Sequence, residues 1–197
     1  MFKELALMVW MMWSIVTIAL VLLPLFPNLW KKIGILTYLV FLAFWLPIAY
    51  LILLSQNLLL QIKMDFHIIV VFLGFILIMI GLMIHVWTAK LLGIKALIGY
   101  NVVRPDNEKS GLITSSLFSI VRHPTYLAHT SLWLGFFLLT GFLSLMILTL
   151  LDFLITYFMI IPLEEKELIQ RFRQEYIDYK KRVPKFFPRL LIKGKID

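Results

Sequence analysis

Two short clusters of polar residues interrupt an otherwise apolar sequence. The first is Arg122-His123-Pro124, and its proline suits the first turn of a helix, where a missing N–H costs nothing. Arg122 and His123 are therefore expected at a helix N-terminus, whose unbonded N–H groups attract carboxylates or phosphates. The same two residues also suit the anchoring of a helix end among lipid head groups. The sequence leaves both interpretations open.

The second cluster is the acidic pair Glu164-Glu165, which follows a long apolar stretch. Carboxylates in the first turn of a helix complement its dipole, so capping is one interpretation. Two adjacent carboxylates in a region that is otherwise basic also suit the binding of a cationic group. The pair is therefore a candidate site as well as a candidate cap.

The remaining polar candidates lie within or beside apolar stretches. Asp152 is predicted inside a membrane span, where an acid is costly enough to be a functional candidate, with His129 as its expected partner. A structural hydrogen bond across two helices is the other interpretation. His85 and His67 are interpreted as residues at the membrane surface. The four histidines lack the spacing of a metal site, so no metal is predicted.

The composition sets the class of protein that must position these residues. The chain has 197 residues, of which 61% are apolar and 15% charged, whereas soluble domains carry about a quarter charged residues. This excess of apolar residues excludes a water-soluble globule. Cysteine is absent, which excludes disulfides, thiolate metal sites and cysteine nucleophiles. We predict an all-α integral membrane protein with a single membrane domain, residues 1–197.

The apolar stretches predict about five transmembrane helices, because each crossing needs about 20 apolar residues. The stretch 124–163 is too long for one crossing at about 1.5 Å per residue, and Gly141 and Ser144 divide it into a tight helical hairpin. The first stretch is interpreted as a retained helix rather than a signal peptide. The expected spans are about 5–26, 33–55, 66–89, 124–142 and 145–163.

These spans divide the chain into four regions. Three N-terminal transmembrane helices occupy 1–89, a cytoplasmic loop 90–123, the hairpin 124–163, and an amphipathic helix with a tail 164–197. Within the last region, apolar side chains recur at helical spacing as far as Arg182, and Val183-Pro184 ends the helix.

Lysines and arginines gather on one side of this arrangement. Most lie in the loop 90–123 and the tail, and cytoplasmic segments carry such an excess, so the N-terminus is predicted outside and the C-terminus in the cytoplasm. The net charge of +8 is expected to attract anionic lipids. No fold that binds nucleic acid is recognisable.

In this order and spacing, the clusters resemble the superfamily of isoprenylcysteine carboxyl methyltransferases and phospholipid methyltransferases. The resemblance covers roughly residues 108–190. Its motifs are Leu112-Ile113-Thr114, Phe118, Arg122-His123-Pro124-Thr125-Tyr126, Glu164-Glu165-Lys166-Glu167-Leu168, Tyr176-Ile177-Asp178-Tyr179 and Val183-Pro184-Lys185-Phe186-Phe187-Pro188.

The resemblance implies methyl transfer from S-adenosylmethionine to a lipid or prenylated substrate drawn from the bilayer, at a cytoplasmic site without a metal. Arg122 and His123 are implied to hold the cofactor's carboxylate, and Glu164 and Glu165 its amino or ribose groups. Arg122, His123 and Glu165 are the implied catalytic residues. The implied cofactor contacts are Ser110, Leu112, Ile113, Phe118, Arg122, His123, Pro124, Tyr126, Glu164 and Glu165, and the implied substrate contacts are Arg171, Arg173 and His129.

Several positions depart from the pattern of the superfamily. Isoprenylcysteine enzymes usually carry an arginine one turn before the glutamate pair, where this chain has Met159-Ile160-Ile161. Arg122, Arg171 or Arg173 would have to take its place. Ser110 stands in place of a common histidine, Phe118 in place of a frequent tyrosine, and Ser116 and Arg173 in place of frequent glycines.

The methyl acceptor and the reaction class remain open at this point. Carboxylate O-methylation of the isoprenylcysteine type needs no base. Amine N-methylation of a phospholipid must remove a proton, with Glu164, Glu165 or His123 as the candidate base. The alternatives to methyl transfer are a membrane reductase that uses NADPH and a non-catalytic membrane scaffold.

Overall fold

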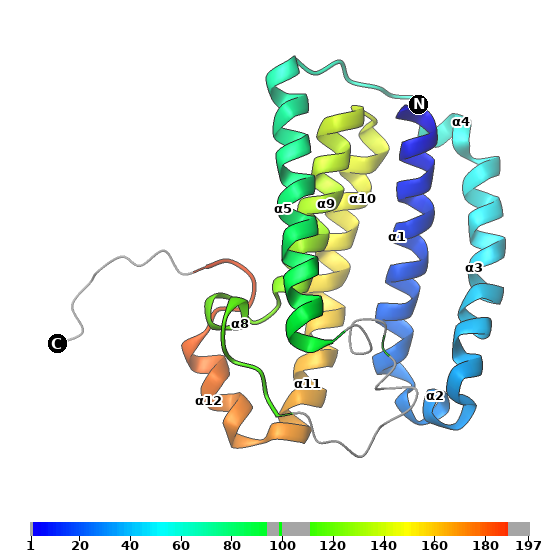
Figure 1. Ribbon diagram of the computed structural model, residues 1–197. Helices are drawn as coiled ribbons and strands as arrows, with labels where there is room; N and C mark the ends of the chain where they lie inside the picture. Colours follow the sequence, from blue (N-terminus) through cyan, green and yellow to red (C-terminus); the bar gives the residue numbers. More distant parts are fainter. Residues whose placement is uncertain (1, 94–98, 100–110, 189–197) are drawn as a thin grey trace.

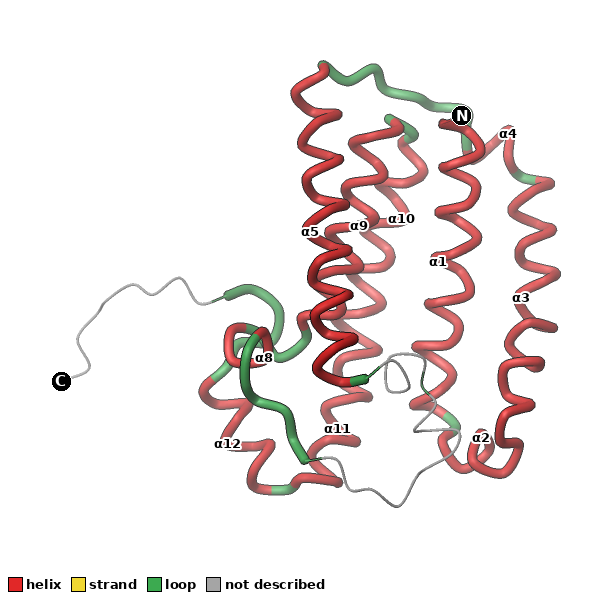
Figure 2. The backbone as a smooth tube through the Cα atoms, in the orientation of Figure 1, coloured by secondary structure: helices red, strands yellow, loops and turns green. Residues whose placement is uncertain are grey.

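The computed structural model describes residues 2–93, 99 and 111–188, which form helices joined by short connections (Figures 1 and 2). Five longer helices run side by side in Figure 1. They are α1 (Phe2–Leu25), α3 (Thr37–Leu54), α5 (Ile68–Leu92), α9 (Pro124–Thr140) and α10 (Leu143–Ile155). Shorter elements are α2 (Pro27–Ile33), η1 (Gly34–Leu36), α4 (Gln56–Leu59) and α8 (Leu117–Ile120). The predicted all-α membrane fold is confirmed.

Four helical stretches are long and apolar enough to cross a membrane, namely Phe2–Leu25, Pro27–Leu54, Ile68–Leu92 and Leu143–Phe172. They correspond to the first, second, third and fifth predicted spans. The fourth predicted span is α9, which has 17 residues and packs along α5. The count of five crossings, like the orientation of the termini, stays a prediction.

The predicted hairpin lies between α9 and α10. Gly141 ends α9 with a φ of +79°, and its N–H donates to the carbonyl of Phe137 at 2.8 Å. A Cβ at this position would lie 2.1 Å from the Met64 carbonyl oxygen, so the turn needs glycine for space as well as for conformation. Met64 in turn donates its N–H to the Gly141 carbonyl at 2.8 Å.

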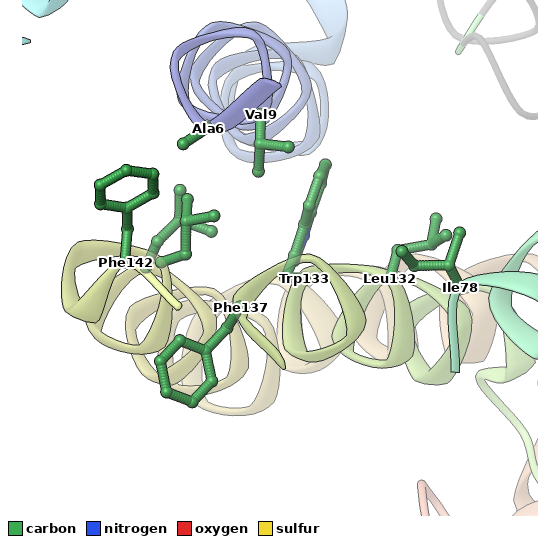
Figure 3. Close-up of a cluster of buried hydrophobic side chains, with 9 residues drawn as sticks. Ala6, Val9, Ile78, Leu132, Trp133, Phe137 and Phe142 are labelled. Carbon is green, nitrogen blue, oxygen red and sulfur yellow. The ribbon is translucent and has the colours of Figure 1, made fainter. Parts of the chain in front are cut away.

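The hairpin is held against α5 and α1 by close packing. A Cβ on Gly74 of α5 would lie 2.8 Å from the carbonyl oxygen of Gly135 on α9, so the two backbones touch. Beside this contact, Trp133 of α9 faces Val9 of α1 (Figure 3). The hairpin is therefore packed against helices on two sides, and this packing fixes the position of the start of α9.

The C-terminal helices differ from the prediction of a span ending near 163 followed by one amphipathic helix. From α10 the helix continues without interruption through a π-helical turn, η2 (Thr156–Ile160), into α11 (Ile161–Phe172). Residues after 163 are good helix formers, so nothing ends the helix at the predicted boundary. The break comes at Arg173, whose φ is +49°, and α12 (Gln174–Arg182) follows. Val183 ends α12, as predicted.

Candidate functional site

The start of α9 lies against the chain segment that follows α12. The Arg122 N–H donates to the carbonyl of Pro184 at 2.9 Å, and the His123 N–H donates to that of Lys185 at 3.3 Å. His123 is the residue before α9, and Pro124 occupies the first turn. Phe186 is buried, and it packs against the ring of Phe153 with 5.4 Å between the ring centroids. These contacts fix both ends of the segment Val183–Phe186, which we call the strap.

Arg122 forms a buried ion pair with Glu165. Its Nη2 and Nε atoms donate to Glu165 Oε1 at 2.7 and 3.1 Å, and both side chains are about 5% exposed. The Nη1 atom donates to the carbonyl of Lys180 at 3.0 Å and also to that of Val183. The guanidinium thereby ties α9, α11, α12 and the strap together.

Glu165 is the centre of a wider charge network. Its Oε2 accepts a hydrogen bond from Lys180 Nζ at 2.6 Å, and its Oε1 lies 3.3 Å from His123 Nε2. The other ring nitrogen, Nδ1 of His123, lies 3.3 Å from Glu164 Oε2. Burial lowers the pKa of His123, but its interactions with the carboxylates of Glu164 and Glu165 outweigh this and leave the pKa above its usual value.

Two polar atoms in this region are buried and lack a hydrogen bond within the described part of the chain. They are Glu164 Oε2, which is in ionic contact with His123 Nδ1 at 3.3 Å, and the hydroxyl of Tyr176. A buried polar atom without a partner costs about 1–3 kcal/mol. Both atoms are therefore candidates for contact with a polar ligand.

Among the other implied cofactor residues, Ser110 lies outside the described residues. Tyr126 stacks on His123 with 5.8 Å between the ring centroids. The carbonyl of Phe118 accepts a hydrogen bond from the Tyr179 hydroxyl at 2.5 Å. Leu112 packs against the cluster of Tyr176, Tyr179 and Val183, and Ile113 is half-buried.

The three implied substrate residues lie in different surroundings. The Arg171 guanidinium is 5.0 Å from the centroid of the Phe172 ring, and Arg173 is exposed at the break before α12. His129 lies further along α9, with its ring 4.8 Å from that of His85. None of the three is among the residues that contact Glu165 in the ion pairs described above, and their role stays a prediction.

The expected pairing of Asp152 with His129 is wrong. The Asp152 carboxylate accepts a hydrogen bond from the indole N–H of Trp13 at 2.9 Å, which joins α10 to α1. Sequence reasoning considered the neighbouring helix of the hairpin, whereas the partner comes from the other end of the chain. Only the packing of α1 against the hairpin decides between them.

Sequence reasoning also missed Lys180 as a site residue. It lies 15 residues after Glu165 on a different helix, and the break at Arg173 brings the two together. Beside this pair opens a cleft of about 440 Å³, whose lining includes Glu165, Lys166 and Lys180. The basic residues at the end of α12 could have indicated a partner for the glutamate pair, but they were interpreted only as charges that attract anionic lipids.

Comparison with known proteins points to the same segment. Residues 69–175 match the family described as phospholipid methyltransferase. The cobalt-zinc-cadmium resistance protein CzcN of Cupriavidus metallidurans is 35% identical over 79 residues, which is 40% of this chain and 36% of that protein. The matched part thus spans about a third of the relative. No solved structure matches the chain.

The family match extends from the start of α5 to the first residues of α12. It therefore includes the hairpin, Arg122, His123 and both glutamates, while α1 and α3 lie outside it. Together with the apolar helices, this agrees with the resemblance found in the sequence. The chain belongs to the phospholipid methyltransferase family, within the superfamily of integral membrane methyltransferases that also contains isoprenylcysteine carboxyl methyltransferase.

Proposed function

We propose that this protein transfers a methyl group from S-adenosylmethionine to a lipid or lipidated acceptor drawn from the bilayer. The observation that carries the proposal is the buried cluster of Arg122, His123, Glu164 and Glu165, which lies inside the family segment. When bound, S-adenosylmethionine would supply a methyl group that its sulfonium already activates.

The side chains present suit the polar groups of this cofactor. It carries an ammonium, a carboxylate and ribose hydroxyls, and the site offers a carboxylate oxygen and a hydroxyl that lack hydrogen bonds, at Glu164 and Tyr176. Glu164 Oε2 suits the ammonium or a ribose hydroxyl. Leu112 offers apolar surface beside Tyr176.

Arg122 has a different position from the one the resemblance implies. Four of its five N–H donors already bind Glu165 and two carbonyls of the C-terminal segment, so a cofactor carboxylate could bind it directly only through the fifth, on Nη2. In the present geometry Arg122 orients Glu165 and closes the strap over the site. We therefore assign it a positioning role, in which it also excludes water.

His123 and Glu164 supply the proton acceptor that an amine substrate would need. His123 Nδ1 lies 3.3 Å from Glu164 Oε2, so a proton taken up by either group is shared between them. Methylation of a carboxylate acceptor of the isoprenylcysteine type removes no proton, so it would not need this pair as a base. The family name favours the phospholipid amine, and the absence of the arginine before Glu164 favours it as well.

A transfer assay distinguishes these acceptors. Purified protein is incubated with S-adenosylmethionine labelled in the methyl group and with either phosphatidylethanolamine or farnesylcysteine in detergent. Label in the phospholipid, lost in Glu164→Gln but retained in the exposed control Lys181→Gln, is the expected result. Label in farnesylcysteine alone would identify the O-methylation alternative, and label in neither would contradict both acceptors.

A further inference from the structure

The cleft beside Glu165 is lined by three lysines from three different segments. Lys166 extends from α11, Lys180 from α12 and Lys185 from the strap, and Gln170 adds an amide. We propose that this cleft binds the phosphate of an anionic phospholipid head group. The proposal does not depend on methyl transfer, because it rests on Lys166 and Lys185, which the proposed reaction does not use.

The charges around the cleft leave a positive excess. Glu165 is the acid among its lining residues, and its carboxylate is already neutralised by Arg122 at 2.7 Å and Lys180 at 2.6 Å. Of the neighbouring acids, Glu164 contacts His123, while Glu167 is not among the lining residues. An anion would therefore meet lysines and no uncompensated carboxylate on the lining.

Two of the lysines are available to a ligand. Within the described residues, neither Lys166 nor Lys185 forms an ion pair. Lys166 is exposed, and the Lys185 ammonium lies over the Tyr157 ring, 4.3 Å from its centroid. Lysine ammoniums are compact point charges with three donors each, and they commonly bind phosphate.

Two exposed aromatic rings are linked to Lys185 of the cleft, Phe158 through Tyr157 and Phe187 along the chain, and they indicate a lipid rather than a soluble anion. Phe158 packs against Tyr157 at 5.1 Å and is 66% exposed, and Phe187 follows the strap with 65% exposure. The cleft begins at Pro162, where the apolar part of the helix gives way to the charged residues of α11. A free phosphate would satisfy only the lysines, whereas a phospholipid satisfies the lysines with its phosphate and the rings with its acyl chains.

Native mass spectrometry of the full chain tests the proposal. Delipidated protein in detergent is titrated with phosphatidylglycerol, and retained lipid is counted for the wild type and for Lys166→Gln/Lys185→Gln. We expect binding to weaken about 30-fold, which corresponds to about 1 kcal/mol for each lysine. Lys181→Gln/Arg182→Gln removes the same charge from exposed positions of α12 outside the cleft and is expected to bind as the wild type does.

Further arms separate the possible occupants. Because Lys185 is half-buried, Lys166→Gln alone serves as a second variant, with an expected loss of about fivefold. Lys166→Arg/Lys185→Arg is expected to restore binding. Equal weakening in Lys166→Gln/Lys185→Gln and in Lys181→Gln/Arg182→Gln would overturn the proposal in favour of general surface charge. Competition by inorganic phosphate at the lipid's concentration, or displacement by S-adenosylhomocysteine, would overturn it in favour of a soluble anion or the cofactor.

Discussion

The helical stretch Leu143–Phe172 carries two buried carboxylates in contrasting regions. Asp152 lies among apolar helices, where its carboxylate accepts a hydrogen bond from the neutral indole of Trp13. Glu165 lies at the other end of the stretch and contacts the cationic side chains of Arg122 and Lys180 as well as His123. The first acid joins two helices through a neutral donor, whereas the second joins α11 to α12 and to the start of α9 through cations, so removing their charges has very different consequences.

The largest effect is expected from Glu165→Gln. The substitution keeps the size of the side chain but leaves Arg122 buried without a counter-charge, which costs about 3–5 kcal/mol. The free energy of unfolding in detergent, followed by denaturant titration, measures the loss. A loss below about 1 kcal/mol would show that the network around Glu165 contributes little to stability.

The next largest effect concerns two strained backbone positions in the same region. Ser116 and Arg173 have φ values of +58° and +49°, which side chains other than glycine rarely adopt, and the superfamily often has glycine at both. We expect Ser116→Gly and Arg173→Gly each to raise the free energy of unfolding by about 1 kcal/mol. Gly111, with open space around its Cβ position, offers Gly111→Ala as a control with little expected change.

Asp152→Asn is the matched counterpart of Glu165→Gln on the same helical stretch. The asparagine carbonyl still accepts the hydrogen bond from Trp13, and no cation loses a partner among the described residues. We therefore expect a change of about 1 kcal/mol or less in the same unfolding measurement. A loss as large as that of Glu165→Gln would mean that Asp152 has a charged partner that the contact with Trp13 does not account for.

The smallest effect is a pH dependence that arises at His123. Its pKa is raised in the folded protein, so its protonated form stabilises the fold below the unfolded pKa of about 6.5, and this contribution is lost as pH rises through the folded value. The melting temperature should therefore fall more in the wild type than in His123→Gln when the pH is raised from about 6.5, the unfolded pKa, to about 8. Parallel curves would contradict the assigned role of His123.

The sequence predicted the membrane class and the hairpin because long apolar stretches and the glycine at 141 act locally. Local patterns also singled out Arg122 before a helix start and the acidic residue Glu165, and the spacing around the hairpin suggested that they meet, although Glu165 lies within a continuous helix and not at the predicted helix start. The partner of Asp152, the link from Lys180 to Glu165 and the break at Arg173 depend on packing between distant segments. No periodicity in a single sequence encodes such contacts, which is why these three features were missed or mispredicted.

The most direct test of the account is calorimetric titration of the purified chain with S-adenosylmethionine and S-adenosylhomocysteine. We predict that both bind the wild type and Lys181→Gln with similar affinity, and that Glu164→Gln, which keeps the fold, binds both more weakly. Absence of heat with either compound in folded wild-type protein would contradict the assignment of the cluster at Arg122, His123 and Glu164 as a cofactor site. Equal binding by Glu164→Gln would contradict its assigned role in that site.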